Sequence, residues 1–164
     1  MLTRYNRIIN DPEFIRAMSL INECEKDRVF CGHGIGHLTD TARIGYILIL
    51  ENNIPISKDI IYAAAFLHDI GRTSEYKDGT PHNIAGAQLA GDILSRCGYD
   101  ADEISQITQA ILSHRAMTKK SSADADILSD VLHKADKLSR LCCSCSAYEL
   151  CNWPDNKKNN TIQY

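Results

Sequence analysis

Histidines and aspartates interrupt several apolar helical stripes in this sequence. Asp136 follows Leu128 and Leu132 at intervals of four residues, so it lies where a core residue is expected. His68 and Asp69 come directly after the apolar run at 60–67. A polar group on a buried face is costly unless it is hydrogen-bonded, paired or bound to a metal ion. The residues that fit this pattern are His37, His68, Asp69, His82, His114 and Asp136.

These six side chains together suggest a metal site. A single buried histidine is most often a hydrogen-bonded core group. Imidazole and carboxylate ligands without a thiolate suit Mn, Fe, Co, Zn or Ni better than a structural zinc site, and Mg is a further candidate. We therefore expect one or two divalent ions. Such an ion lowers the pKa of a bound water and neutralises charge on a phosphoryl oxygen, which is the chemistry of phosphate ester hydrolysis.

The elements that must position these residues are predicted to be helices, about six in number, with no convincing strand. Helical periodicity follows the Asp11-Pro12 start, and a helix from Asp100 or Asp102 carries isoleucines on one face. A polar loop is expected at 72–80, long enough to bind a ligand. The remaining predicted helices cover about 36–53, 60–71, 81–97 and 124–143.

Length and composition fit one compact domain. The 164 residues predict a single domain over 1–150, followed by a polar tail over 151–164. Apolar residues at 44% and charged residues at 24% exclude disordered and fibrous classes. The net charge of −3, with scattered basic residues, argues against duplex nucleic acid as a partner. No apolar run is long enough to cross a membrane, and the N-terminal residues lack the pattern of a signal peptide. The odd number of cysteines, seven, fits free thiols and a cytoplasmic location. The oligomeric state stays open.

Three segments resemble the HD-domain superfamily of metal-dependent phosphohydrolases over about 32–140. They are GHLTDTARIGYIL with His37, AAAFLHDIGR with His68 and Asp69, and HKADKLSRL with Asp136. The resemblance implies a single all-α, HD-domain-like bundle in which these four residues bind a divalent metal ion. It also implies a metal-dependent phosphohydrolase that uses metal-activated water.

Two further segments are similar to the dinuclear branch of that superfamily. His82 in PHNIAGAQLA and His114 in AILSHRA resemble its additional histidines, and Asp69 would then bridge two ions. Alternatively, His82 and His114 serve as acid, base or phosphate-contacting groups around one ion. The GYP motif of the cyclic-dinucleotide branch is absent, so we do not expect that substrate.

The expected catalytic residues are Asp69, His68 and His33. His33 precedes His37 by four residues, and either it takes part in substrate binding or proton transfer or it is a loop histidine. Guanidinium groups suit phosphate, and those closest in sequence to the expected ligands are Arg72, Arg115 and Arg140. The expected substrate is a small phosphorylated metabolite, a nucleotide in particular.

Two other functions are compatible with the same residues. One is a di-iron oxygenase of HD type, and the other is a non-catalytic module that senses a nucleotide. His133 is expected on a helix flank, outside the site. The C-terminal cysteines are expected to pack the last helix, with metal binding or redox sensing as the alternative; they are Cys142, Cys143, Cys145 and Cys151.

Overall fold

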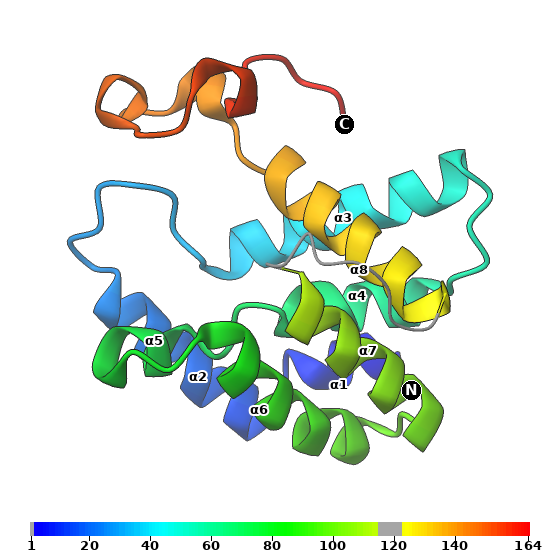
Figure 1. Cartoon of the computed structure of the whole chain (residues 1–164). Helices are drawn as coiled ribbons and strands as arrows, with labels where there is room; N and C mark the ends of the chain where they lie inside the picture. The colour runs from blue at the N-terminus through cyan, green and yellow to red at the C-terminus, as the bar shows by residue number, and fades with distance from the viewer. Residues whose placement is uncertain (1, 115–122) are drawn as a thin grey trace.

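The computed structural model describes residues 2–114 and 123–164, and within these ranges every regular element is helical (Figure 1). The α-helices are α1 (Arg4–Ile8), α2 (Pro12–Cys24), α3 (Ile35–Glu51), α4 (Lys58–Leu67), α5 (Arg72–Asp78), α6 (His82–Cys97), α7 (Ala101–Ser113) and α8 (Ala123–Leu138). Short 3-10 helices follow at Cys142–Ser144, Tyr148–Leu150 and Asp155–Lys157. The all-α prediction is therefore confirmed, with more helices than the six expected.

Side chains cap the starts of α2, α4 and α7, and the caps of α2 and α7 lie at the predicted Asp11 and Asp100. The carboxylate of Asp11 accepts hydrogen bonds from two backbone N–H groups in the first turn of α2. The hydroxyl of Ser57 accepts a hydrogen bond from the N–H of Ile60 at the start of α4. Asp100 and Glu103 form a reciprocal capping box on α7. These side chains satisfy backbone donors that would otherwise lack partners at each helix start.

Three predicted boundaries are wrong. The helix expected over 60–71 ends earlier, at Leu67. Residues 72–78 form α5 instead of a loop, and this helix buries no residue, so it carries no apolar stripe to reveal it. The last long helix ends at Leu138 and not near Cys143. No glycine or proline follows Leu138 directly, so the usual stop signal is missing from the sequence.

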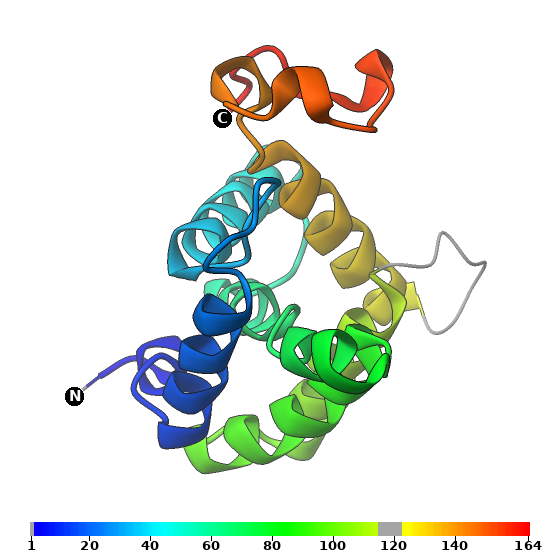
Figure 2. The same cartoon turned by 90° about the vertical axis from the view of Figure 1, so that its left-hand side faces the viewer.

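Helix α4 lies in the middle of the bundle (Figures 1 and 2). It packs against α3, α7, α8, α1 and α6, and seven of its ten residues are buried. Its final turn therefore ends inside the protein. His68, which caps α4, and the following Asp69 lie there almost without solvent contact.

Gly71 brings the end of this segment directly against α6. A Cβ atom at Gly71 would lie 2.1 Å from the carbonyl oxygen of His82 and 2.4 Å from the amide nitrogen of Gly86. Only a residue without a side chain fits this contact. The first turn of α6, with His82, is thereby held close to Asp69.

Among the described residues, no helix combines the length and the apolar character that a membrane span requires.

Candidate metal centre

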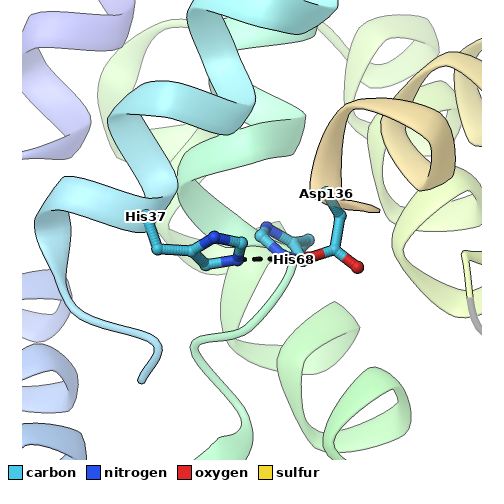
Figure 3. A group of neighbouring side chains, drawn as sticks. All are labelled: His37, His68 and Asp136. Atoms are coloured by element: carbon cyan, nitrogen blue, oxygen red, sulfur yellow. Dashed lines mark ion pairs between the residues drawn. The ribbon is translucent and has the colours of Figure 1, made fainter. Parts of the chain in front are cut away.

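His37, His68 and Asp136 form one triad of potential ligands. They come from α3, from the end of α4 and from α8, and their side chains point toward one another (Figure 3). The Oδ1 atom of Asp136 lies 3.2 Å from His37 Nε2 and 3.9 Å from His68 Nε2. Within the triad, the potential ligand atoms all lie within 4.8 Å of one another.

Asp69, His82 and His114 form a second triad. His82 is the first residue of α6, and His114 caps the C-terminal end of α7. His82 Nε2 lies 3.3 Å from Asp69 Oδ1 and 3.3 Å from His114 Nε2. All three residues are buried.

Asp69 lies between the two triads. Its Oδ1 atom faces His82, whereas its Oδ2 atom lies 3.1 Å from His68 Nε2 and 3.6 Å from His37 Nε2. One carboxylate oxygen is thus available to each triad. The six residues singled out in the sequence form one continuous cluster.

In each of the four histidine rings of the cluster, Nδ1 contacts a polar group outside the cluster and Nε2 faces the other potential ligands. The Nδ1 atoms of His68 and His114 lie 2.7 Å and 2.6 Å from the carbonyl oxygens of Ala65 and Ile111. His37 Nδ1 lies 2.9 Å from the hydroxyl of Ser139. The remaining ring, His82, pairs through Nδ1 with the carboxylate of Glu75. Such contacts orient the rings of metal-ligating histidines.

The donor set fits a divalent ion. Asp69 Oδ2 and His68 Nε2 are buried and make no hydrogen bond, although they lie only 3.1 Å apart. Buried polar atoms without a partner are rare in folded proteins, and a cation between them satisfies both. Two carboxylates and four imidazoles without a thiolate fit the metals named from the sequence.

The charges of the cluster support the same assignment. Burial favours the neutral form of Asp69, but His68, His37 and Arg72 outweigh it and hold the pKa of this carboxyl well below its usual value. Burial likewise opposes ionisation of Asp136, yet its neighbours, His37 first, lower its pKa. Both aspartates are therefore carboxylates at neutral pH.

Burial lowers the pKa of His114 to about 4 and also lowers the pKa of His82. These two rings are neutral at pH 7, as metal ligands must be. Burial opposes charge on His68 as well, but Asp69 and Asp136 raise its pKa.

Cationic side chains surround the two carboxylates. Arg72 Nε lies 2.9 Å from Asp69 Oδ1, and Lys137 Nζ lies 2.8 Å from Asp136 Oδ2. Arg140 Nη2 lies 3.5 Å from Asp136 Oδ1 and 3.0 Å from His37 Nε2. Two of the predicted substrate-binding arginines, Arg72 and Arg140, therefore border the cluster. The third, Arg115, lies outside the described residues.

The cluster opens into a cavity of about 520 Å³, which we call the metal-site cavity. This volume is within the usual range for small-molecule sites. The cations on its wall are Arg28, Arg72, Lys137 and Arg140. His133, expected outside the site, also lines this cavity. A negatively charged substrate fits such a wall.

His33 lies in the loop before α3 but faces the cluster. Its Nε2 atom lies 4.0 Å from Asp69 Oδ2, and its side chain is only 4% exposed. Its Nδ1 atom pairs with Glu25, which also accepts a hydrogen bond of 2.5 Å from the hydroxyl of Tyr76. Burial lowers the pKa of His33 to about 4. His33 therefore lies beside the cluster, and its role in substrate binding or proton transfer stays a prediction.

Sequence reasoning missed the carboxylates that hold two of these rings. Glu75 lies on α5, which was expected to be a loop, and Glu25 lies eight residues before His33 across a turn. Neither carboxylate interrupts an apolar stripe. The available signal was the presence of an acidic residue near each histidine in the sequence, which is too common to be selective.

The C-terminal cysteines are not part of the last helix, because α8 ends before them. Cys142 is buried, Cys143 is exposed, and Cys145 and Cys151 are half-buried free thiols. Among the described residues, they do not form a cluster of metal ligands.

The family model of the HD domain matches residues 34–141. A protein of Clostridium beijerinckii, named only as an uncharacterized protein, is 44% identical over 163 residues, which cover 99% of this chain and 100% of that protein. The bifunctional uridylyltransferase/uridylyl-removing enzyme of Erythrobacter litoralis is 26% identical over 141 residues, which cover 84% of this chain but 14% of that enzyme. The enzyme of the same name from Nitrobacter winogradskyi is 26% identical over 117 residues, 70% of this chain and 11% of that enzyme.

A crystal structure of a predicted HD superfamily hydrolase from an uncultured Thermotogales bacterium has the same fold. It superposes with a TM-score of 0.62 at 22% sequence identity and covers 91% of this chain and 83% of that chain.

Proposed function

This chain belongs to the HD-domain family, and from that membership we propose that it is a metal-dependent phosphohydrolase acting on a small phosphorylated metabolite, a nucleotide in particular. The observation that carries the proposal is the position of Asp69. One oxygen of this buried carboxylate faces each of the two triads, and one of these oxygens, Oδ2, makes no hydrogen bond. This arrangement fits a pair of divalent ions better than a hydrogen-bonded core.

His37, His68 and Asp136 would hold one ion, and His82 and His114 would hold the other, with Asp69 shared between them. Bound there, a divalent ion supplies a lower pKa for a water ligand and neutralises charge on a phosphoryl oxygen. The protein supplies the neutral rings of His82 and His114 and the buried carboxylates that such an ion needs.

The neighbouring side chains have separate tasks in this proposal. Arg72, Lys137 and Arg140 line the metal-site cavity and neutralise the phosphate as it binds. His33 directs Nε2 toward the cluster, so it can orient the attacking water by a hydrogen bond. The carboxylate of Glu25 holds the ring in this orientation. Asp69 keeps its negative charge throughout.

A nucleotide is supported by the size and charge of the cavity and by the names of two relatives. Two of the relatives are named as uridylyl-removing enzymes, and a uridylyl group is a nucleotide unit. Uridine phosphates therefore belong in the first set of substrates.

The test is phosphate or pyrophosphate release from a panel of nucleotides with Mn²⁺, Co²⁺ or Mg²⁺. We expect metal-dependent release that is lost in Asp69→Ala and kept in Asp92→Asn, a control at an exposed carboxylate of α6. Metal content is measured in parallel, and Asp69→Ala should bind less metal. Full activity in Asp69→Ala would exclude the proposed mechanism.

The same six ligands also suit a di-iron oxygenase, because one carboxylate lies between two nitrogen-rich triads. Iron retained through anaerobic purification, with oxygen consumption and no phosphate release, would favour this second function. Saturable nucleotide binding without turnover under any of the metals would favour a sensing module.

A further inference from the structure

A second cavity, of about 260 Å³, lies beside the metal centre and is lined largely by the segment after α8. We call it the C-terminal pocket. Its apolar and aromatic wall includes Leu141, Cys142, Cys145, Tyr148 and Trp153. Figures 1 and 2 both show this C-terminal segment, in orange and red, at one end of the bundle beyond the end of α8.

The C-terminal pocket adjoins the metal centre. His37, a member of the first triad, lines it, and Arg140 and Trp153 line both this pocket and the metal-site cavity. Arg140 Nη2 lies only 3.0 Å from His37 Nε2, so the pocket begins where a phosphate would bind. The rest of a phosphorylated molecule can therefore extend into the pocket.

Most of the pocket wall lies outside the part of the chain that matches the family. The HD-domain match ends at residue 141, whereas Cys142, Cys145, Tyr148 and Trp153 follow it. The shared bundle accounts for the metal centre. The C-terminal pocket is formed mostly by residues outside the family match, and residues outside a shared fold are where differences in specificity arise.

The segment is fixed to the bundle, so the pocket is formed before any ligand binds. The carbonyl oxygen of Asn159 accepts hydrogen bonds from the N–H groups of Cys142 at 3.1 Å and Cys143 at 3.3 Å. The side-chain amide of Asn159 donates to the carbonyl of Leu138 at 2.8 Å, at the end of α8. A largely preformed pocket binds without a large ordering cost.

The wall chemistry fits a planar ring with hydrogen-bonding groups. Trp153 and Tyr148 are aromatic, and the ammonium groups of Lys137 and Lys158 lie 5.5 Å and 4.1 Å from the centres of their rings. The exposed carboxylate of Asp40 lies on the same wall and can accept hydrogen bonds. Aromatic side chains stack on flat rings, and a carboxylate accepts from ring or sugar donors.

We propose that the C-terminal pocket binds the aromatic ring of the substrate's non-phosphate part, a nucleobase, while the phosphate lies at the metal centre. The proposal rests on the proposed function for the phosphate half of the substrate. It adds that residues beyond the HD domain select the base.

The test compares two neighbouring cysteines. Cys145→Phe fills the pocket, because Cys145 is half-buried on its wall, and Cys143→Phe is the control, because Cys143 is exposed and does not line the pocket. Binding of the four common nucleoside monophosphates is measured by calorimetry, and hydrolysis is measured with the preferred nucleotide and with glycerol phosphate, which has no ring. We expect Cys145→Phe to weaken nucleotide binding and nucleotide kcat/KM at least tenfold, with glycerol phosphate unaffected. Cys143→Phe should match the unmodified protein.

Trp153→Ala provides a second test that does not depend on accommodating a larger side chain, and it should also weaken nucleotide binding. Equal nucleotide affinity in Cys145→Phe, Trp153→Ala and the unmodified protein would overturn the proposal. So would failure of the unmodified protein to bind any of the four nucleotides. A third outcome separates the two proposals: nucleotides bind, their binding is weaker only in Cys145→Phe and Trp153→Ala, and none of them is hydrolysed. In that case the pocket is confirmed and the phosphohydrolase proposal fails.

Discussion

At the scale of single residues, the partner on Nδ1 distinguishes the histidines in the cluster and beside it. His68 and His114 contact main-chain carbonyls, which the helix ends provide in any sequence. His82 instead pairs with the carboxylate of Glu75, and His33 with that of Glu25. A carboxylate partner fixes the ring and makes its other nitrogen a stronger ligand or base. We therefore expect Glu75 to affect metal binding through His82, and Glu25 to affect only His33.

We predict that Glu75→Gln weakens metal binding at the triad of Asp69, His82 and His114 by roughly 10- to 100-fold, as for comparable carboxylate partners. Metal content after dialysis against limiting Mn²⁺ should fall toward one ion per chain. Glu25→Gln is the matched control, because its partner, His33, belongs to neither triad, and it should keep both ions. Unchanged metal content in Glu75→Gln would contradict this role.

Histidine burial also predicts a pH dependence of stability in the metal-free protein. Burial lowers the pKa of His33 and of His114 to about 4 in the folded state, from the ordinary histidine value of 6.5 in the unfolded chain. Between pH 6.5 and 4 the unfolded chain binds more protons, so the free energy of unfolding falls as the pH falls. His68 has a raised pKa, so the stability it contributes is lost only as the pH rises above 6.5, outside this window.

The contribution of His33 is on the order of 3 kcal/mol across that window. Urea unfolding with a chelator at several pH values should therefore show a shallower slope in His33→Gln than in the unmodified protein. Equal slopes in the two proteins would show that His33 is not held neutral by the fold.

At the scale of elements, the sequence predicted helices wherever an apolar face was buried. Helices α3, α4, α6, α7 and α8 carry such faces, and the potential metal ligands were found because they interrupt these faces or directly follow them. Helix α5 buries no residue, so neither the helix nor the contact of its Glu75 with His82 could be recognised. Contacts between segments far apart in the chain, such as Ser139 with His37, leave no periodic signal. What periodicity cannot predict is therefore the set of partners around the ligands.

The contact between the segment after α4 and the start of α6 yields a prediction for Gly71→Ala. The added methyl group would lie 2.1 Å from the carbonyl oxygen of His82 and 2.4 Å from the amide nitrogen of Gly86. These are backbone atoms of α6, which cannot change rotamer to relieve the clash as a flexible side chain can. Such overpacking costs about 1–3 kcal/mol or more, and it moves His82 away from Asp69. We expect a lower thermal midpoint and loss of one bound ion.

The control for this change is Gly91→Ala, at a glycine within α6 that has nothing within 4 Å of the added atom. It should stabilise the protein by roughly 0.5–1 kcal/mol, because alanine favours the helix. If Gly71→Ala were as stable as Gly91→Ala, the close approach would not be a constraint on the fold.

At the scale of the whole molecule, the six potential metal ligands come from distant parts of the chain. Its six residues lie between positions 37 and 136 and come from α3, α6, α8 and the ends of α4 and α7. An unfolded chain cannot hold them together, so an ion bound by the cluster binds the folded state almost exclusively. Metal binding and folding must then be linked.

This linkage predicts that Mn²⁺ raises the thermal midpoint of the protein. At a metal concentration 100-fold above Kd, the gain is about 2.7 kcal/mol for one site, which corresponds to roughly 5–10 °C for a domain of this size. In Asp69→Ala the shift should be much smaller, because the carboxylate shared by the two triads is absent. Differential scanning calorimetry with and without a chelator measures both shifts. An equal shift in Asp69→Ala would mean that the stabilising ion binds outside this cluster, since an ion at either triad should bind less well without the carboxylate that the two triads share.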